Sequence, residues 1–312
     1  MATARETDLV TVAVVRTGDE KAVEYLFNER QRIYVLAERA ATEDQSARRL
    51  NEAFDKNRPI KVTLNAKRGT IERVSEPTRA ELEVFARSHV PLEKPDKIVP
   101  IDIAKIDPTT FNFVDLYLKW PTFRRCTKIV PRYAKARDIF DFCAQLSCNL
   151  PGPYAVTPCN PFQYVIDGCY ARAHQMRRII TTRYRYCCEK VFSFATANND
   201  RLAVKADKWG GCCVTWWYHV APVIRVRMKL KGFPKPLVLA MVIDPGMFDK
   251  PVLLSTWLSA QENTACHPNA RVTSYSIQPG SAYTPSGSGF STDPNYTATE
   301  ATLIAYSSLT TC

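Results

Sequence analysis

The stretch DGCYARAHQMRRII, residues 167–180, places a cysteine at the point where a helix is expected to begin. Asp167 is positioned to cap that helix, and Gly168 allows the chain a tight approach. The thiolate is the reactive form of cysteine, and the partial positive charge at a helix N-terminus lowers a thiol pKa. Cys169 is therefore a candidate nucleophile. On spacing alone, one half of a disulfide is the competing interpretation.

A cysteine nucleophile needs a base, and the base needs a third group that orients it. His219 lies between apolar residues in a predicted strand, VTWWYHV at 214–220, and Asp244 ends the next predicted strand. Adjacent antiparallel strands would place these two side chains together, and a helix packed across them would bring Cys169 to the imidazole. A core histidine and an ordinary turn aspartate are the alternatives. His174 is a rival base, but it shares a short helix with Cys169.

Cysteine and charge divide the 312-residue chain into two unlike halves. All 11 cysteines lie in 126–312, whereas 1–125 contains none. The first part carries 22 basic and 20 acidic residues, and the second carries 20 basic and 11 acidic. The second half is expected to be stapled by disulfides in an oxidising compartment, with at least one thiol left over. A reduced intracellular chain with buried thiols is the alternative.

The first half predicts a small βαββα unit. Strands are expected at 32–36, 60–64 and 70–74, with capping boxes that open helices at Thr42 and Thr78. A stretch rich in proline and lysine, 91–108, has too little periodicity for a helix and is expected to be a linker. We therefore divide the chain into a unit at 1–108, a linker at 109–125 and a second unit at 126–312.

The second half predicts a helix at 134–146 and strands within 213–230, with a basic outer face made by Arg225, Arg227 and Lys229. The adjacent cysteine pairs at 187–188 and 212–213 fit cross-strand disulfides. No C-x2-C pair occurs, so the usual zinc spacing is absent and no metal is expected. The longest apolar run is strand-sized, well below the roughly 18 residues that a membrane-spanning helix needs.

Several short blocks of the second half resemble bacterial protein-glutaminases, enzymes that deamidate glutamine side chains in intact proteins. The blocks occur in the same order and with similar gaps: DGCYARAHQMR at 167–177, CEK at 188–190, CCV at 212–214, WYHVA at 217–221, and IDP at 243–245 with Phe248. The likeness covers about 126–312, and the first half resembles the pro-region of that family. Cys126, Cys143 and Cys187 have no obvious counterpart, which leaves the disulfide pairing open.

This resemblance implies an α+β fold with a transglutaminase/papain-like core, in which the helix that bears Cys169 packs on an antiparallel sheet. An inhibitory pro-domain precedes this core in the chain. It implies Cys169 as nucleophile, His219 as acid and base, and Asp244 as orienter, with no cofactor. Trp216, Trp217 and Tyr218 are expected to wall the cleft. The implied partners are protein substrates with exposed glutamine, the chain's own pro-region in the cleft and an activating protease, with Arg124-Arg125 a possible processing site.

We further expect a secreted monomer that binds neither nucleic acid nor membrane. Because the N-terminus lacks a hydrophobic signal core, export would use another route or a segment already removed. Two other functions stay open. The first is acyl transfer or proteolysis on the same core, and the second is a disulfide-rich binding module without activity.

Overall fold

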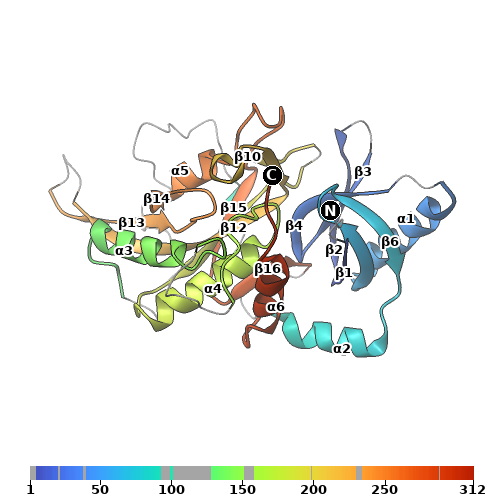
Figure 1. Ribbon diagram of the computed structural model, residues 1–312, viewed down its shortest axis with the longest axis horizontal. Helices are drawn as coiled ribbons and strands as arrows, with labels where there is room; N and C mark the ends of the chain where they lie inside the picture. The colour runs from blue at the N-terminus through green and yellow to red at the C-terminus, as the bar shows by residue number, and fades with distance from the viewer. Residues whose placement is uncertain are drawn as a thin grey trace.

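The computed structural model describes residues 5–19, 22–37, 40–92, 99–100, 128–150, 158–197, 199–229, 234–287 and 289–312. Two units lie side by side (Figure 1). We call residues 5–92 the N-terminal unit and residues 128–312 the C-terminal unit. The expected linker at 109–125, its arginine pair and Cys126 lie outside the described residues.

The N-terminal unit is a six-stranded sheet whose strand order is β1-β5-β6-β4-β3-β2. Helix α1 contacts this sheet, and an apolar cluster that includes Tyr25, Leu50 and Ile60 fills the space beneath it. The elements are β1 (Arg5–Val10), β2 (Val12–Thr17), β3 (Val23–Phe27), β4 (Arg30–Leu36), α1 (Ala40–Asp55), β5 (Ile60–Asn65), β6 (Thr70–Ser75) and α2 (Arg79–Ser88).

The βαββα order is correct for β4 to α2, and Thr78 forms the expected capping box. Helix α1, however, begins at Ala40, before the expected cap at Thr42, and the prediction misses the three strands that precede β4. Those strands hide their pattern because they bury charged residues: Arg16 on β2 and Glu24 on β3 are both about 5% exposed. The two side chains form an ion pair at 2.9 Å. Apolar alternation, the usual sign of a strand, is therefore weak in this part of the sequence.

Glu29, in the turn between β3 and β4, makes the stability of the N-terminal unit sensitive to alkali. It is 7% exposed and accepts a hydrogen bond from the Thr11 amide at 2.7 Å. Burial raises the pKa of Glu29 from 4.5 to about 8. A raised pKa means that the folded unit keeps this carboxyl neutral, so the stability it contributes is lost as pH rises toward 8.

We expect the thermal midpoint to fall between pH 5 and pH 8, and Glu29→Gln to flatten that slope. The amide can still accept from Thr11 but cannot ionise, and one pKa unit corresponds to about 1.4 kcal/mol. Thermal unfolding followed by circular dichroism at several pH values measures the slope. Glu83→Gln, at an exposed position on α2, is the matched control. An unchanged slope in Glu29→Gln would contradict this assignment.

The C-terminal unit is built on a second six-stranded sheet, whose order is β14-β13-β12-β9-β15-β8 and whose pairs are all antiparallel. Its helices are α3 (Tyr133–Ala144), α4 (Cys169–Thr182), α5 (Leu254–Ser259) and α6 (Thr297–Tyr306). The strands are β9 (Glu189–Phe194), β10 (Leu202–Lys205), β11 (Cys213–Trp216), β12 (Tyr218–Met228), β13 (Leu237–Val242), β14 (Val252–Leu253), β15 (Ser274–Gln278), β16 (Ala282–Ser286) and β17 (Gly289–Thr292).

Both faces of this sheet are covered. Ile224 and Val226 on β12 share an apolar cluster with α3 and with Met176 and Ile180 of α4. Val223, which points to the opposite face, shares a different cluster with residues of α5, β10 and β11. Strand β12 is therefore buried on both faces, and helix α4 packs on it as the resemblance implies.

The expected basic outer face of β12 is wrong at Arg225. This residue is 5% exposed and pairs with the buried Glu189 of β9 at 3.2 Å. Only Arg227 and Lys229, toward the end of the strand, are exposed. The residues do alternate, but Arg225 lies on the same face of β12 as Val223, and α3 covers the opposite face, which carries Ile224 and Val226. Both faces are covered by other elements, so neither belongs to solvent as the sequence pattern alone suggests.

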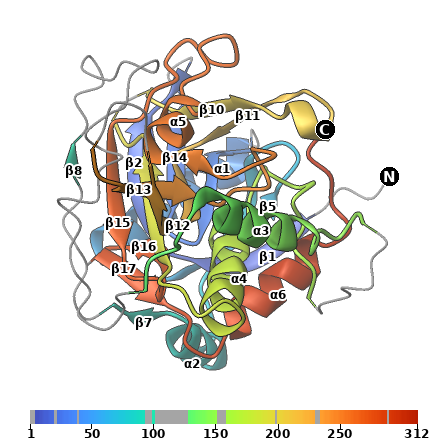
Figure 2. The same cartoon turned by 90° about the vertical axis from the view of Figure 1, so that its left-hand side faces the viewer.

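Two short segments that follow α2 pair with strands of the C-terminal unit. Strand β7 (Val90–Pro91) pairs with β17, and β8 (Val99–Pro100) pairs with β15 at the sheet edge (Figure 2). The prediction of a linker beginning at 91 is therefore wrong at these positions. A strand of two residues is too short to show the alternation of side chains by which a strand is recognised in a sequence.

Disulfides hold the outer segments of the C-terminal unit. The bonded pairs in the described residues are Cys148–Cys159, Cys212–Cys312 and Cys213–Cys266. Cys187 is also disulfide-bonded. The adjacent cysteines 212 and 213 therefore bond to separate distant segments, but neither Cys312 nor Cys266 lies in a strand, so the predicted cross-strand disulfides are wrong for this pair. Cys188 does not follow that prediction, since it is a buried free thiol, as are Cys143 and Cys169.

Candidate active site

Cys169 begins helix α4 because Gly168 turns the chain into it. Gly168 adopts φ 79°, in the left-handed region, and a Cβ there would lie 2.8 Å from Cδ2 of Tyr306. The expected cap by Asp167 takes a different form. Its carboxylate accepts from the adjacent Gly168 amide at 2.7 Å, and helix α4 has no side-chain cap. The thiol at the start of the helix is 1% exposed.

His219 and Asp244 come together as the sequence predicts. Nε2 of His219 lies 2.8 Å from Oδ2 of Asp244, and Trp257 donates its indole N–H to the same oxygen at 2.9 Å. Burial alone would raise the pKa of Asp244, but the His219 charge and these two hydrogen bonds bring it below its ordinary value. Asp244 is therefore held as a carboxylate that fixes the imidazole through one nitrogen.

Two indole rings fix the plane of the His219 ring. Trp216 stacks on it with centroids 4.6 Å apart at 12°, and Trp257 stacks with centroids 5.3 Å apart at 22°. The other ring nitrogen, Nδ1, is buried and has no hydrogen-bond partner among the described residues. The imidazole is thus oriented on three sides and keeps one nitrogen for a further proton donor or acceptor.

The Cys169 thiol reaches the strand that carries His219. It accepts a hydrogen bond from the backbone amide of Val220, the residue next to His219. Burial raises the pKa of the thiol well above its ordinary value, and the positive charge of Arg172 opposes that shift. The covered site therefore holds a neutral thiol, and its ionisation requires the site to become more polar or more open.

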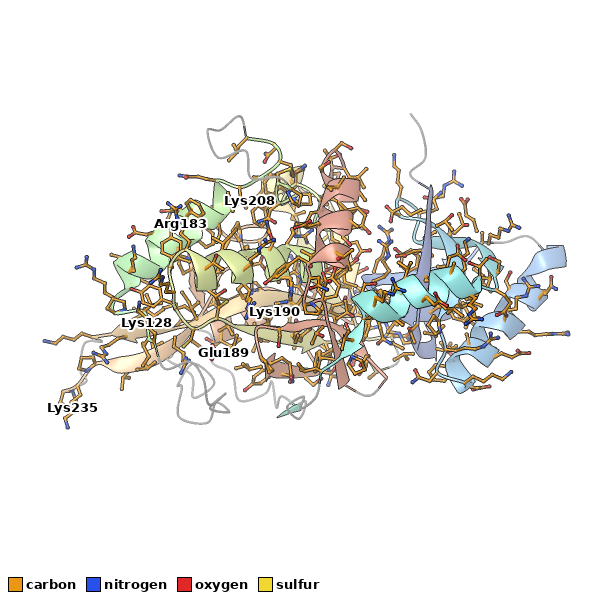
Figure 3. The ribbon with its side chains drawn as sticks, turned by 90° about the horizontal axis from the view of Figure 1, so that it is seen from below. Lys128, Arg183, Glu189, Lys190, Lys208 and Lys235 are labelled. Carbon is orange, nitrogen blue, oxygen red and sulfur yellow. A yellow bond between two sulfur atoms is a disulfide. The ribbon has the colours of Figure 1, made fainter. Side chains whose placement is uncertain are left out.

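The rival base, His174, belongs to a separate buried cluster. Its Nδ1 lies 2.7 Å from Nζ of Lys190, and its Nε2 lies 3.2 Å from the Asp293 carbonyl. Burial, together with the Lys190 charge, lowers the pKa of His174 to about 2. Lys190 itself is fully buried beside Glu189 in the sequence (Figure 3). Both ring nitrogens of His174 are engaged there, so neither is free to act as a base for Cys169.

A glutamine of the N-terminal unit fills the site. Gln31, on β4, is 0% exposed. Its side-chain oxygen accepts from the backbone amide of Cys169 at 3.2 Å, and its side-chain nitrogen donates to the Val165 carbonyl at 2.9 Å. The carboxamide group is therefore bound at both ends by main-chain groups beside the thiol.

The three aromatic residues that were expected to wall the cleft occupy two different positions. Trp216 is fully buried and donates to the carbonyls of Val165 and Ile166 at 3.0 and 3.1 Å. Trp217 and Tyr218, in contrast, donate to backbone carbonyls of the segment 27–30 in the N-terminal unit. Trp216 therefore supports the site from within, whereas Trp217 and Tyr218 meet the chain that covers it.

Ion pairs of Arg30 and Arg201 join the two units. Arg30 contacts Asp167 of the C-terminal unit at 3.1 Å, and also Glu6 and Asp8 of its own unit. Arg201 contacts Asp19 at 2.8 Å and both carboxylate oxygens of Glu24. The interface is thus held by buried charges that have partners on the opposite unit.

Sequence reasoning missed Gln31, Val165 and Trp257. Gln31 precedes Cys169 by 138 positions and belongs to no motif, so no local signal assigns it to the site. Val165 acts through its backbone carbonyl, which any residue type would supply. Trp257 lies in a short apolar helix, where a core position is the ordinary interpretation.

The described residues, in the ranges given above, contain neither a metal centre nor a membrane-spanning helix. Within those ranges, no group of three His, Cys, Asp or Glu side chains is arranged to hold a metal ion. No helix described in the structure combines the length and the apolar character needed to cross a membrane.

Comparison with known proteins identifies similar chains. A family model described as glutaminase matches residues 136–261. The crystal structure of a pro-protein-glutaminase aligns with a TM-score of 0.71 at 23% identity, over 99% of this chain and 95% of that chain, which establishes a shared fold. No curated protein matches the chain.

Two structures of protein-glutaminase itself match at higher identity. A crystal structure is 32% identical over 60% of this chain and 92% of that chain, with a TM-score of 0.50. The NMR structure of protein-glutaminase from Chryseobacterium proteolyticum is 33% identical over 59% of this chain and 91% of that chain, with a TM-score of 0.51.

Proposed function

The chain belongs to the protein-glutaminase family, and from that premise we propose that it hydrolyses glutamine side chains of proteins to glutamate and ammonia. In this proposal Cys169 is the nucleophile, His219 the acid and base, and Asp244 the group that orients His219. The observation that carries the proposal is the carboxamide of Gln31, which is bound by the Cys169 amide beside the His219–Asp244 pair.

The first half of the reaction transfers the acyl group to sulfur. His219 takes the thiol proton as the Cys169 sulfur attacks the carboxamide carbon, and the developing oxyanion is held by the Cys169 backbone N–H, which already binds the oxygen of Gln31. His219 then protonates the leaving nitrogen, and the C–N bond breaks to release ammonia. The product of this half is a glutamyl thioester on Cys169.

The second half of the reaction hydrolyses the thioester and regenerates the free enzyme. His219 takes a proton from water, the water oxygen adds to the thioester carbonyl, and the C–S bond breaks to give glutamate and the free thiol. Asp244 stabilises the positively charged imidazole, while the Trp216 and Trp257 rings keep it from turning. Trp217 and Tyr218 face the bound segment of the N-terminal unit and would contact a substrate chain in its place.

We also propose that residues 1–108 are an inhibitory pro-region, that 109–125 is a linker cleaved by another protease, and that 126–312 is the catalytic domain. The buried Gln31 supports this division, because a substrate cannot enter while β4 occupies the site. Disulfide bonds in the C-terminal unit support secretion into an oxidising compartment.

A single assay distinguishes this function from its alternatives. The chain is treated with trypsin, a protein substrate is added, and ammonia, crosslinking and backbone cleavage are measured together. We expect ammonia in proportion to newly formed glutamate, without crosslinks and without cleavage. Crosslinked substrate would instead indicate transfer to lysine amines, and new substrate fragments would indicate proteolysis. A folded chain that produces none of the three would favour a binding module.

A further inference from the structure

The Gln31 side chain is bound as a substrate carboxamide would be. Its oxygen accepts from Cys169 N at 3.2 Å, and its nitrogen donates to Val165 O at 2.9 Å. An acceptor contact at the oxygen and a donor contact at the nitrogen together distinguish a primary amide from a carboxylate. The contacts that recognise Gln31 are therefore contacts to its reactive group.

The backbone around Gln31 is held on both sides as well. Trp217 N donates to the Gln31 carbonyl at 3.0 Å, and Gln31 N donates to Oδ1 of Asp167 at 3.2 Å. The preceding carbonyl, that of Arg30, accepts from the Trp217 indole at 2.7 Å. A glutamine fixed at its side chain and its main chain meets the nucleophile at a high effective concentration.

Resting on the proposed function, we propose that Gln31 is the first substrate of this site and that the chain deamidates it in cis, leaving a glutamate at position 31. His219 takes the proton of the Cys169 thiol, the sulfur forms a bond to Cδ of Gln31, and the Cδ–Nε2 bond breaks so that Nε2 leaves as ammonia with the proton that His219 returns. Water then adds to the thioester, the C–S bond breaks, and the thiol is restored. Each chain performs this reaction once.

The reaction is slow compared with that on an external substrate. Cys169 is buried and its thiol stays mainly neutral, since burial raises its pKa. The second step also needs water in a covered site. The first step therefore occurs while Gln31 stays bound and depends on transfer of the thiol proton to His219, whereas water reaches the thioester when the two units separate briefly. Conversion thus proceeds over the lifetime of the chain rather than at each encounter.

Conversion of Gln31 to glutamate weakens the binding of the N-terminal unit to the C-terminal unit. Glutamate has no side-chain N–H to donate to Val165, so an oxygen would face that carbonyl at close range. The new carboxylate would also be fully buried and close to Asp167, which already binds the Gln31 amide. A buried charge without a partner is costly, and the closed state loses stability relative to the open state.

The experiment follows residue 31 in the intact chain. The full chain and its Cys169→Ala variant are incubated without protease and then denatured. Chymotrypsin, which cleaves after Phe27 and Tyr34, releases residues 28–34 for mass spectrometry. We expect glutamate at position 31 to accumulate in the parent chain and Gln31 to persist in the variant. Gln145, an exposed glutamine of the C-terminal unit, is the internal control and should stay unchanged in both.

Isotope-labelled Cys169→Ala chain mixed with unlabelled parent tests whether the reaction is in cis. The labelled chain should keep Gln31, and the conversion rate of the parent should not depend on concentration. The product-like variant Gln31→Glu should show several-fold more activity before proteolysis than the parent, whereas Gln31→Met, which carries no charge, should show a smaller increase.

Each of the remaining outcomes contradicts either the cis reaction or the proposed function. Gln31 that persists in a parent chain whose trypsin-treated form releases ammonia from a protein substrate overturns the cis reaction alone. Equal conversion of Gln31 in the parent and in Cys169→Ala means spontaneous hydrolysis and also overturns it. Absence of both the conversion of Gln31 and ammonia from the external substrate overturns the proposed function itself.

Discussion

Replacing Cys169 by alanine is expected to lower ammonia release from a protein substrate by about 10⁴–10⁶-fold after proteolytic activation, the range seen when a covalent nucleophile is removed. The reason is that no other group can form the thioester at this position. His219 and Asp244 would stay paired, so the loss reflects the missing sulfur rather than a rearranged site. Ammonia measured against time, with circular dichroism to confirm folding, tests this expectation.

Cys143→Ala is the matched control for that variant. Cys143 is also a buried free thiol, but it lies in the apolar cluster between α3 and the sheet. It should keep most of the activity, because only packing is lost. A graded variant, Asp244→Asn, should also be strongly impaired, since the imidazole would lose the charge that orients it. Residual activity in Cys169→Ala similar to that of the parent would rule out the thiol mechanism.

Cleavage between the two units is expected to raise activity toward an external protein by at least about 100-fold. Gln31 lies at the Cys169 amide, where the proposed function places the substrate, and the ion pairs of Arg30 and Arg201 join its unit to the C-terminal unit. A closed state favoured by only about 3 kcal/mol leaves fewer than one site in a hundred open. Initial rates of ammonia release, measured with freshly purified chain before and after trypsin, give the ratio.

Arg201→Ala offers a control that leaves the catalytic groups in place. It removes the contacts to Asp19 and Glu24, so part of the activity should appear without any cleavage. Trypsin should then bring the variant and the parent to similar rates. Equal activity of the parent before and after cleavage would show that the N-terminal unit does not inhibit.

The local chemistry of the site could be predicted from the sequence because its signals are short-range. A cysteine after Asp-Gly at a helix start, a histidine within an apolar strand and an aspartate at a strand end each have a readable local context. Their association follows from antiparallel pairing of consecutive strands. The structure places His219 against Asp244, and it places the Cys169 thiol at the amide of Val220.

Other features depend on contacts between distant segments and so have no local sequence signal. The strands β2 and β3 bury the charges of Arg16 and Glu24, which neutralise each other only when the two strands pair. Arg225 is buried where it pairs with Glu189 on the neighbouring strand, on the face of β12 that Val223 shares. In both ion pairs, the residues next to a charged side chain in the sequence do not reveal which distant residue will pair with it.

The sequence alone determined the two halves of the chain, the disulfide-rich character of the second and the identity of the three candidate catalytic residues, since these depend on residue type and on nearest neighbours. Only the tertiary structure decided what fills the site. Gln31 reaches Cys169 and Val165 through the docking of one sheet on another unit, and two of the groups that bind it are main-chain atoms that every residue possesses. Recognition by backbone geometry leaves no signal in side-chain identity, so it becomes visible only when the chain is folded.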